Sequence, residues 1–391
     1  MLTSYRRVLA EPGTLRFSSA GLVARLPISM VGLGIVLLVS STTGSYGVAG
    51  AVSAAYMVTN AALAILQARL VDRFGQPLVL STASAVFGVS MAVLVVAVRS
   101  DWPILAAYVA AAVAGGSLPQ IGSCVRARWS YVLGDPADIQ TAYAIEAVVD
   151  EAVFMLGPIL VTVLATAWDP AAGLAVAVLA CVVGTLAFCA QRSTEPPAHP
   201  PSRSGGQRPP MPWRTVVPLA VVSAALGVLF GAAEVATVAF AQEQGKQAYA
   251  GGLLALYALG SLVAGLLTGA VTWRRGPAIR VRWGAFAMAC TMMPLYFVSS
   301  VPVMGLVLLL GGFAIAPTLI GALSLTERVV PPARLTEGMA IMHTGLVAGV
   351  APGATIGGVV IDALGASPAY LVCLAAGVVA ALAAQALPRS D

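Results

Sequence analysis

The feature that most constrains this chain is a series of twelve apolar runs separated by short polar segments. Each run has about twenty residues, which is enough for one α-helix to cross a hydrocarbon core of roughly 30 Å. Helices satisfy their own backbone hydrogen bonds, as lipid requires. We therefore predict an all-α membrane protein with spans at residues 17–39, 47–68, 78–98, 102–125, 139–166, 171–190, 215–241, 249–270, 279–300, 302–325, 335–361 and 367–387.

Composition narrows the possible functions. Charged residues make up only 9% of the chain, against about 25% in an ordinary soluble domain. The five cysteines fall inside apolar runs without metal-ligand spacing, so we interpret them as small core residues. The sequence contains no phosphate-binding loop, no cluster of Cys and His, and no nucleophile beside a base. We therefore expect no enzymatic activity, no cofactor and no metal.

Basic residues indicate how the chain is oriented. If both termini are cytoplasmic, eighteen arginines lie in cytoplasmic segments, whereas only Arg99 and Lys246 lie outside and Arg25 lies within a span. Cytoplasmic loops of membrane proteins carry this excess of positive charge. We therefore predict a multi-pass protein of the plasma (inner) membrane with cytoplasmic termini, and the net charge of +5 does not indicate nucleic acid binding. The eighteen are Arg6, Arg7, Arg16, Arg69, Arg73, Arg126, Arg128, Arg192, Arg203, Arg208, Arg214, Arg274, Arg275, Arg280, Arg282, Arg328, Arg334 and Arg389.

The two halves of the chain repeat one pattern. Tyr56 and Tyr257 are 201 residues apart, and each lies nineteen residues before a glycine, Gly75 or Gly276. Later in each half, Pro158 corresponds to Pro352 at a shift of 194. Tandem copies of a membrane unit are typical of transporters.

The halves meet at the only long polar stretch. Residues 191–214 are rich in proline and glycine, which favours a mobile cytoplasmic linker over a binding segment. We predict two pseudo-symmetric six-helix bundles, at residues 1–190 and 215–391.

A short turn after the second span, residues 68–77, reads ARLVDRFGQP. It resembles the turn that follows the second helix in the major facilitator superfamily, roughly G-x-L-x-D-R-x-G-R-K. The matching residues are Leu70, Asp72, Arg73 and Gly75. The resemblance covers nearly the whole chain, since the six-plus-six division also matches. It implies the major facilitator fold, with alternating access to a central cavity.

The turn also departs from the family pattern. Ala68 replaces the first glycine, and Gln76 and Pro77 replace the basic pair. In the second half, Trp273 stands where the acid would be.

The resemblance implies a conformational latch made by Asp72, Arg73 and Gly75. Asp72 would face a helix N-terminus near residues 335–337 and a neighbouring arginine, Arg126 or Arg128. A helix dipole and an opposite charge both stabilise a carboxylate. The alternative is that Asp72 and Arg73 only solvate a tight turn.

Two helix patterns resemble the drug/proton antiporter-like members of the superfamily. One is Gly157-Pro158 on the fifth span. The other is a row of small residues around Pro352 on the eleventh span: Gly345, Gly349, Gly353, Gly357 and Gly358. The resemblance favours export. The alternative is that these residues only allow close helix packing.

Charged residues deep in the spans carry the sharpest chemical information. Each costs about 2.5–3.5 kcal/mol at a helix centre. Arg25 lies in the first span, and Glu146, Asp150 and Glu151 lie in the fifth. We predict that Arg25 pairs with Glu146 or Asp150, and that the remaining acid exchanges a proton. The alternative is a permanent structural ion pair.

Other polar residues are candidates for a substrate or proton site: Glu234, His343, Tyr56, Asn60, Tyr257 and Ser261. The last four occupy matching positions in the two halves, where they face the cleft between the bundles or hold helices together.

Together these features predict a secondary active transporter, with protons as the coupling ion and a small molecule as the substrate. The first hypothesis is export of a small amphipathic compound or drug. The alternative is proton-linked import of a sugar, peptide or organic acid. We expect a monomer in the lipid bilayer, because one chain contains both halves of a pathway.

Overall fold

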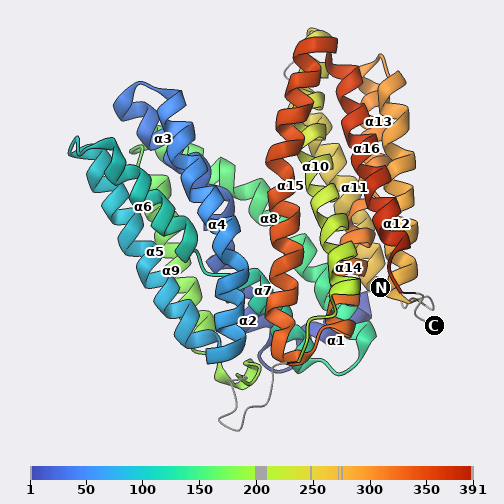
Figure 1. The fold of residues 1–391 in the computed structure, drawn as a ribbon, viewed down its shortest axis with the longest axis horizontal. Helices are drawn as coiled ribbons and strands as arrows, with labels where there is room; N and C mark the ends of the chain where they lie inside the picture. Colours follow the sequence, from blue (N-terminus) through green and yellow to red (C-terminus); the bar gives the residue numbers. More distant parts are fainter. Residues whose placement is uncertain (1, 199–208, 247–248, 272, 274–275, 389–391) are drawn as a thin grey trace. The chain divides into compact units, whose positions relative to one another are not determined.

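The computed structural model describes residues 2–198, 209–246, 249–271, 273 and 276–388. The predicted cytoplasmic residues Arg203, Arg208, Arg274, Arg275 and Arg389 lie outside this part of the chain, as does the middle of the predicted linker. Within it, every regular element is a helix (Figure 1). The α-helices are α1 (Leu2–Ala10), α2 (Thr14–Arg25), α3 (Pro27–Thr43), α4 (Tyr46–Phe74), α5 (Gln76–Arg99), α6 (Ile104–Ser117), α7 (Ile121–Val132), α8 (Pro136–Ala167), α9 (Ala172–Cys189), α10 (Trp213–Glu243), α11 (Ala250–Ala270), α12 (Pro277–Met292), α13 (Val301–Gly312), α14 (Ile315–Val329), α15 (Leu335–Leu364) and α16 (Ala366–Gln385).

Eleven helical segments of the described residues are long and apolar enough to cross a membrane, and they coincide with eleven of the predicted spans. The first span is interrupted at Leu26, which keeps helical dihedrals, because Pro27 has no N–H to donate to the carbonyl one turn earlier. The exception is the predicted span 279–300. There α12 ends at Met292, and a 3₁₀ helix follows at Met293–Phe297, which contains Pro294. Proline has no N–H to continue the α-helical ladder.

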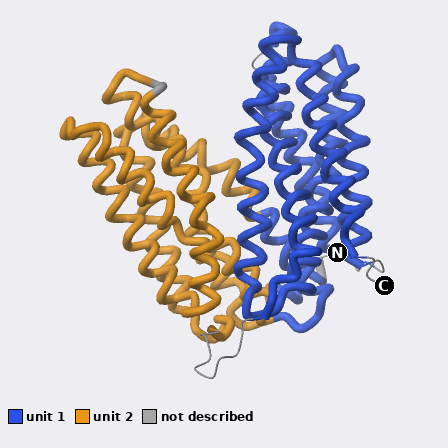
Figure 2. The backbone as a smooth tube through the Cα atoms, viewed as in Figure 1, with its two compact units in different colours: residues 1–8, 133–148, 209–391 blue, residues 9–132, 149–208 orange. Residues whose placement is uncertain are grey.

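The helices form two compact units (Figure 2). Unit 2 contains residues 9–132 and 149–208, and unit 1 contains residues 1–8, 133–148 and 209–391. The helix α8 is continuous from Pro136 to Ala167, yet its first part belongs to unit 1 and the rest to unit 2. The units thus differ from the predicted bundles mainly in two segments, 1–8 and 133–148.

The core of unit 2 lies among α3, α4, α5, α6 and α9. Large side chains such as Ile35, Phe87 and Leu94 are fully buried there. Between them stand small residues, including Ala111 and Ala177, which let the helices approach.

Unit 1 contains a very close helix pair, α10 and α15. A Cβ atom at Gly227 or Gly231 would overlap a backbone carbonyl of α15, and one at Gly349 or Gly353 would overlap a carbonyl of α10. The close packing predicted for the eleventh span is therefore present. Its bearing on the direction of transport stays a prediction.

The sequence repeat is visible in the packing of each unit. In unit 2, a Cβ at Gly115 of α6 would overlap the carbonyl oxygen of Tyr56 on α4. In unit 1, a Cβ at Gly312 of α13 would overlap the carbonyl oxygen of Tyr257 on α11. The two units thus share the same helix contact at corresponding residues.

The glycine pair α10–α15 yields a stability prediction. Gly349→Ala places a methyl group on the carbonyl of Ala224, so we expect the free energy of unfolding to fall by about 1–3 kcal/mol. Gly358→Ala on the same helix is the control, because a Cβ there meets no atom within 4 Å. Unfolding in detergent micelles measures both. Equal stability of the two variants would contradict the packing described.

Candidate functional site

One carboxylate in unit 2, that of Asp150 on α8, is bound by two arginines from two other helices. Arg25 at the end of α2 donates from Nη1 to Oδ1 at 2.7 Å, and Arg126 on α7 donates from Nη2 to Oδ2 at 2.5 Å. The arginine side chains are 1% and 6% exposed, whereas the Asp150 side chain is 26% exposed. Charge-assisted bonds of this kind are strong and directional. The acid is thus the most accessible member of a fixed ionic cluster.

Each of the two arginines also donates a hydrogen bond to a backbone carbonyl of its own helix. Arg25 Nε donates to the carbonyl of Gly21 at 3.1 Å, and Arg126 Nη1 donates to the carbonyl of Gly122 at 3.2 Å. Each acceptor is a glycine four residues earlier, one helical turn away. A Cβ at Gly122 would lie only 3.2 Å from Arg126 Nη1. Glycine therefore lets the guanidinium lie along its own helix and point at Asp150.

The sequence predicts that Arg25 pairs with Glu146 or Asp150, and the structure contains an ion pair between Arg25 and Asp150. Arg126 is a second partner that the sequence did not indicate. Glu151 is half-buried next to Asp150. Glu146 is fully buried, in the part of α8 that belongs to unit 1.

The remaining candidates for a substrate or proton site are dispersed over several helices. Glu234 on α10 is exposed, and His343 on α15 is half-buried. Tyr56 is 3% exposed in the core of unit 2, with Asn60 one turn further along α4. Tyr257 on α11 is 6% exposed and contacts Phe230 edge to face; Ser261 is buried one turn away. Burial of both tyrosines within their own units fits the interpretation that they hold helices together.

The turn between α4 and α5 depends on Gly75. Its φ of +88° is unfavourable for residues with a side chain, so glycine allows the reversal between the two helices. Asp72 before it is 8% exposed, whereas Arg73 is exposed and its guanidinium lies 5.0 Å from the ring centre of Phe74. The partner predicted for Asp72 near residues 335–337 belongs to the other unit, and the latch stays a prediction.

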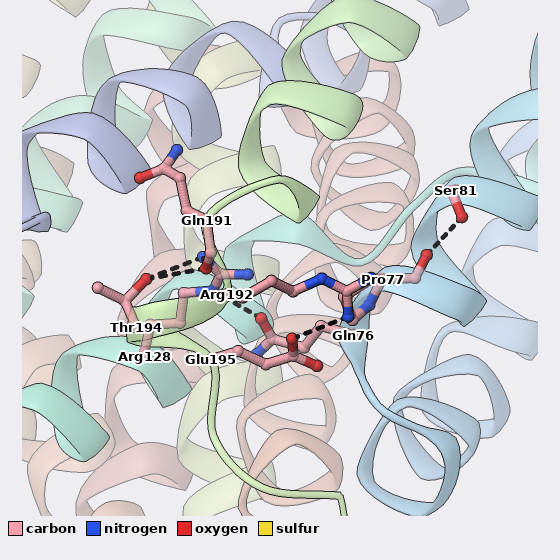
Figure 3. Close-up of polar contacts among 8 residues, drawn as sticks. All are labelled: Gln76, Pro77, Ser81, Arg128, Gln191, Arg192, Thr194 and Glu195. Atoms are coloured by element: carbon pink, nitrogen blue, oxygen red, sulfur yellow. Dashed lines mark hydrogen bonds and ion pairs between the residues drawn. The ribbon is translucent and has the colours of Figure 1, made fainter.

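Arg128 on α7 forms a separate polar cluster near the start of α5 and the end of α9 (Figure 3). Its Nε donates to Gln76 Oε1 at 2.7 Å, and its Nη1 donates to the carbonyl of Gln191 at 2.9 Å and to Thr194 Oγ1 at 3.0 Å. The side chain is fully buried, and its guanidinium lies 3.8 Å from the ring centre of Phe188. These contacts fasten the chain after α9 to the rest of unit 2.

This cluster explains why the turn departs from the family pattern at residue 76. Gln76 accepts from Arg128 and donates from Nε2 to the carbonyl of Cys124 at 3.3 Å. A basic residue at position 76 would place a second positive charge beside Arg128 and offer it no acceptor. The unusual Gln76 in the sequence could have indicated a contact with Arg128. Nothing in the sequence indicated that Phe188, Gln191 and Thr194 also contact Arg128.

Comparison with known proteins assigns the chain to a family. The profile described as the Major Facilitator Superfamily matches residues 17–314 and 235–391, so the chain belongs to this superfamily. Its members are transporters, and with eleven apolar helices of membrane-spanning length among its described residues the chain is a multi-pass membrane protein. None of the curated proteins searched matches the sequence.

The solved structures of similar fold are of proteins named for different solutes. The human organic anion transporter MFSD10 (TETRAN) is 17% identical with a TM-score of 0.75, and the alignment covers 96% of this chain and 100% of that one. A bacterial homologue of the iron transporter ferroportin, in an outward-facing state, is 14% identical with a TM-score of 0.73 and coverages of 95% and 98%. The proton:xylose symporter XylE is also 14% identical, with a TM-score of 0.68 and 94% of each chain covered. These likenesses show the major facilitator fold and no particular substrate.

The Arg128 cluster yields a second prediction. Lysine in place of Arg128 cannot reach Gln76 and Gln191 together, because it lacks the planar fork of the guanidinium. Buried acceptors left without donors cost about 1–3 kcal/mol, so we expect Arg128→Lys to lower the free energy of unfolding by that amount. Arg192→Lys is the control, because Arg192 is 70% exposed beside Glu195 and should change stability by about 0.5 kcal/mol or less. Similar unfolding curves in micelles would contradict a structural role for Arg128.

Proposed function

We propose that this protein is a secondary active transporter that couples solute movement to protons through Asp150. The observation that carries the proposal is the Asp150 carboxylate held between two buried guanidiniums while it keeps 26% of its side chain exposed. Two positive charges stabilise the ionised acid. A proton that reaches Asp150 removes its charge, weakens both ion pairs and frees α2 and α7 from α8. Proton binding is thereby linked to helix movement.

We propose export of a small amphipathic compound as the direction and substrate class. This rests on the Gly157-Pro158 pair in α8 and on the glycine row of α15, which resemble features of proton-coupled exporters in the superfamily. Gly157 lies against Ser29, whose hydroxyl donates to the carbonyl of Val153 at 2.8 Å. This bond gives α8 an outside donor one residue before Phe154, whose carbonyl loses its helical donor because Pro158 has no N–H.

One observation favours a second candidate, proton-linked import of an organic acid. Arg25 and Arg126 present two buried guanidiniums to one carboxylate. A carboxylate on a substrate has the same shape and charge as that of Asp150. Under this alternative, protonation of Asp150 releases the arginines for the substrate.

The two candidates predict opposite fluxes in proteoliposomes. For the exporter, a proton gradient drives amphipathic compounds in the direction opposite to the protons. For the importer, it drives organic acids in the same direction as the protons. A panel of both compound classes with an imposed pH gradient measures this. Flux that does not respond to the gradient in either class would contradict proton coupling.

Asp150→Asn tests the role of the acid. Asparagine keeps the shape but cannot exchange a proton, so we expect gradient-driven accumulation to fall at least ten-fold. Downhill solute movement without a gradient should continue. Asp169→Asn is the matched control, because Asp169 pairs with Arg99 on the surface and is 46% exposed. Unchanged uphill transport by Asp150→Asn would make the cluster a structural ion pair.

We also propose the predicted location and latch: a plasma membrane protein with cytoplasmic termini, in which Asp72 stabilises one conformation. Burial of Asp72 at 8% exposure, next to the Gly75 turn, supports a role beyond solvation.

The latch predicts a change in turnover. We expect Asp72→Asn to alter the transport rate at least three-fold, because a neutral side chain weakens the charge interactions proposed for it. Asp362→Asn on α15 serves as the control, since Asp362 is exposed. Initial rates of transport in proteoliposomes measure the effect of each variant. Equal rates for the two variants would contradict the latch and indicate that Asp72 only solvates the turn.

A further inference from the structure

The C-terminal end of α11 in unit 1 is closed by side chains from the first half of the sequence. The last carbonyls of an α-helix have no partner within the helix, and α11 ends at Ala270 followed by extended backbone at Val271. Tyr5 Oη donates to the carbonyl of Leu266 at 2.7 Å, Gln140 Nε2 to that of Thr268 at 2.8 Å, and Thr141 Oγ1 to that of Gly269 at 2.6 Å.

The donors come from α1 and from the start of α8, and both segments are packed against the end of α11. A Cβ at Gly269 would overlap the Cβ of Ala144 and the hydroxyl of Tyr5. Gln140 is used at both ends of its amide, because its Oε1 accepts from Arg280 Nη1 on α12 at 2.5 Å. The contact is therefore a close interface within unit 1.

The helix α1 is fastened to α8 by a further contact. Arg7 forms an ion pair with Asp138, which lies in the first turn of α8. This contact keeps Tyr5 beside α11. Burial raises the pKa of Tyr5 to about 12, so its hydroxyl remains a donor at physiological pH.

The sequence repeat relates this contact to the predicted latch. A shift of 201 residues maps the end of α4 onto the end of α11, with Asp72 falling on Trp273. A shift of 194 maps Gln140 and Thr141, in the first turns of α8, onto Arg334 and Leu335 at the start of α15. A latch between α4 and α15 therefore has a repeat-related counterpart between α11 and α8. In place of an acid, this counterpart has Trp273, whose Nε1 donates to the carbonyl of Thr268 at 3.0 Å.

We infer that Tyr5, Gln140 and Thr141 form an uncharged clasp on α11 that opens and closes as α8 moves during transport. The assignment of α8 to both units is the reason to expect such movement, since its first part is held by the clasp and its remainder belongs to unit 2. The gating part of the inference rests on the proposed function. The existence of the clasp as a local stabilising element does not.

Two variants remove single hydroxyl groups from the clasp, Tyr5→Phe and Thr141→Val. Matched controls are Tyr131→Phe, at an exposed tyrosine, and Thr166→Val. Thr166 and Thr141 both donate to a carbonyl four residues earlier in α8, but only Thr141 also reaches Gly269. The difference between the two threonine variants therefore isolates the bond to α11.

Hydrogen exchange of the full protein in lipid nanodiscs tests the clasp without substrate or gradient. We expect the amides in the last turn of α11 and the first turns of α8 to exchange at least five-fold faster in Tyr5→Phe and Thr141→Val than in the controls. Equal exchange in variants and controls would overturn the clasp.

Transport rates in proteoliposomes test the gating part. We expect both clasp variants to change turnover at least three-fold relative to the controls. Faster exchange with control-like turnover would make the clasp a static helix cap and overturn gating. Faster exchange in a protein that moves no solute would contradict the proposed function and gating, and would leave the local clasp standing.

Discussion

The constraint on which this structure depends is that a polar group buried among the helices must find its partner inside the protein. Arg25, Arg126 and Asp150 satisfy it with two ion pairs and two glycine carbonyls. Arg128 has neutral acceptors for its Nε and Nη1 and an aromatic ring beside its guanidinium. In both clusters the partners come from other helices, so the polar groups determine how those helices are placed. The residues that are costly to bury thus also position the elements around them.

Small residues allow the helices to pack closely against one another. Lipid offers no hydrophobic force between helices, so association depends on close packing. Carbonyl oxygens of α10 and α15 lie where a Cβ would otherwise be, and the same holds for Tyr56 with Gly115 and for Tyr257 with Gly312. Because the last two contacts are related by the sequence repeat, the duplication is preserved in backbone packing even where side chains have diverged. Interfaces of this kind resist gradual deformation, which favours movement of helices as rigid bodies.

The sequence predicted features that depend on a single helix, such as its length. It did not predict contacts that depend on how a helix is rotated or on residues far apart in the chain. Apolar runs located eleven spans, and the cost of buried charge predicted a pair of Arg25 with Glu146 or Asp150, of which the structure contains Arg25–Asp150. The break before Pro294 was readable from the proline but was hidden by the apolar residues around it. The second arginine that binds Asp150, and the side chains that donate to the carbonyls of α11, could not be predicted from the sequence. Hydropathy does not say which way a helix faces, and Gln140 is 128 residues from Thr268.

The two halves of the chain differ in charge at the turn that they share. The first copy keeps Asp72, and the second has Trp273 at the corresponding position. An acid interacts through charge, which responds to protonation and to neighbouring arginines. An indole donates one neutral hydrogen bond, here to the end of the preceding helix, α11. The second copy therefore recruits neutral donors from Gln140, Thr141 and Tyr5 for the same helix end. At this position the first half thus has an acid, whose charge a proton can remove, and the second half has a neutral indole.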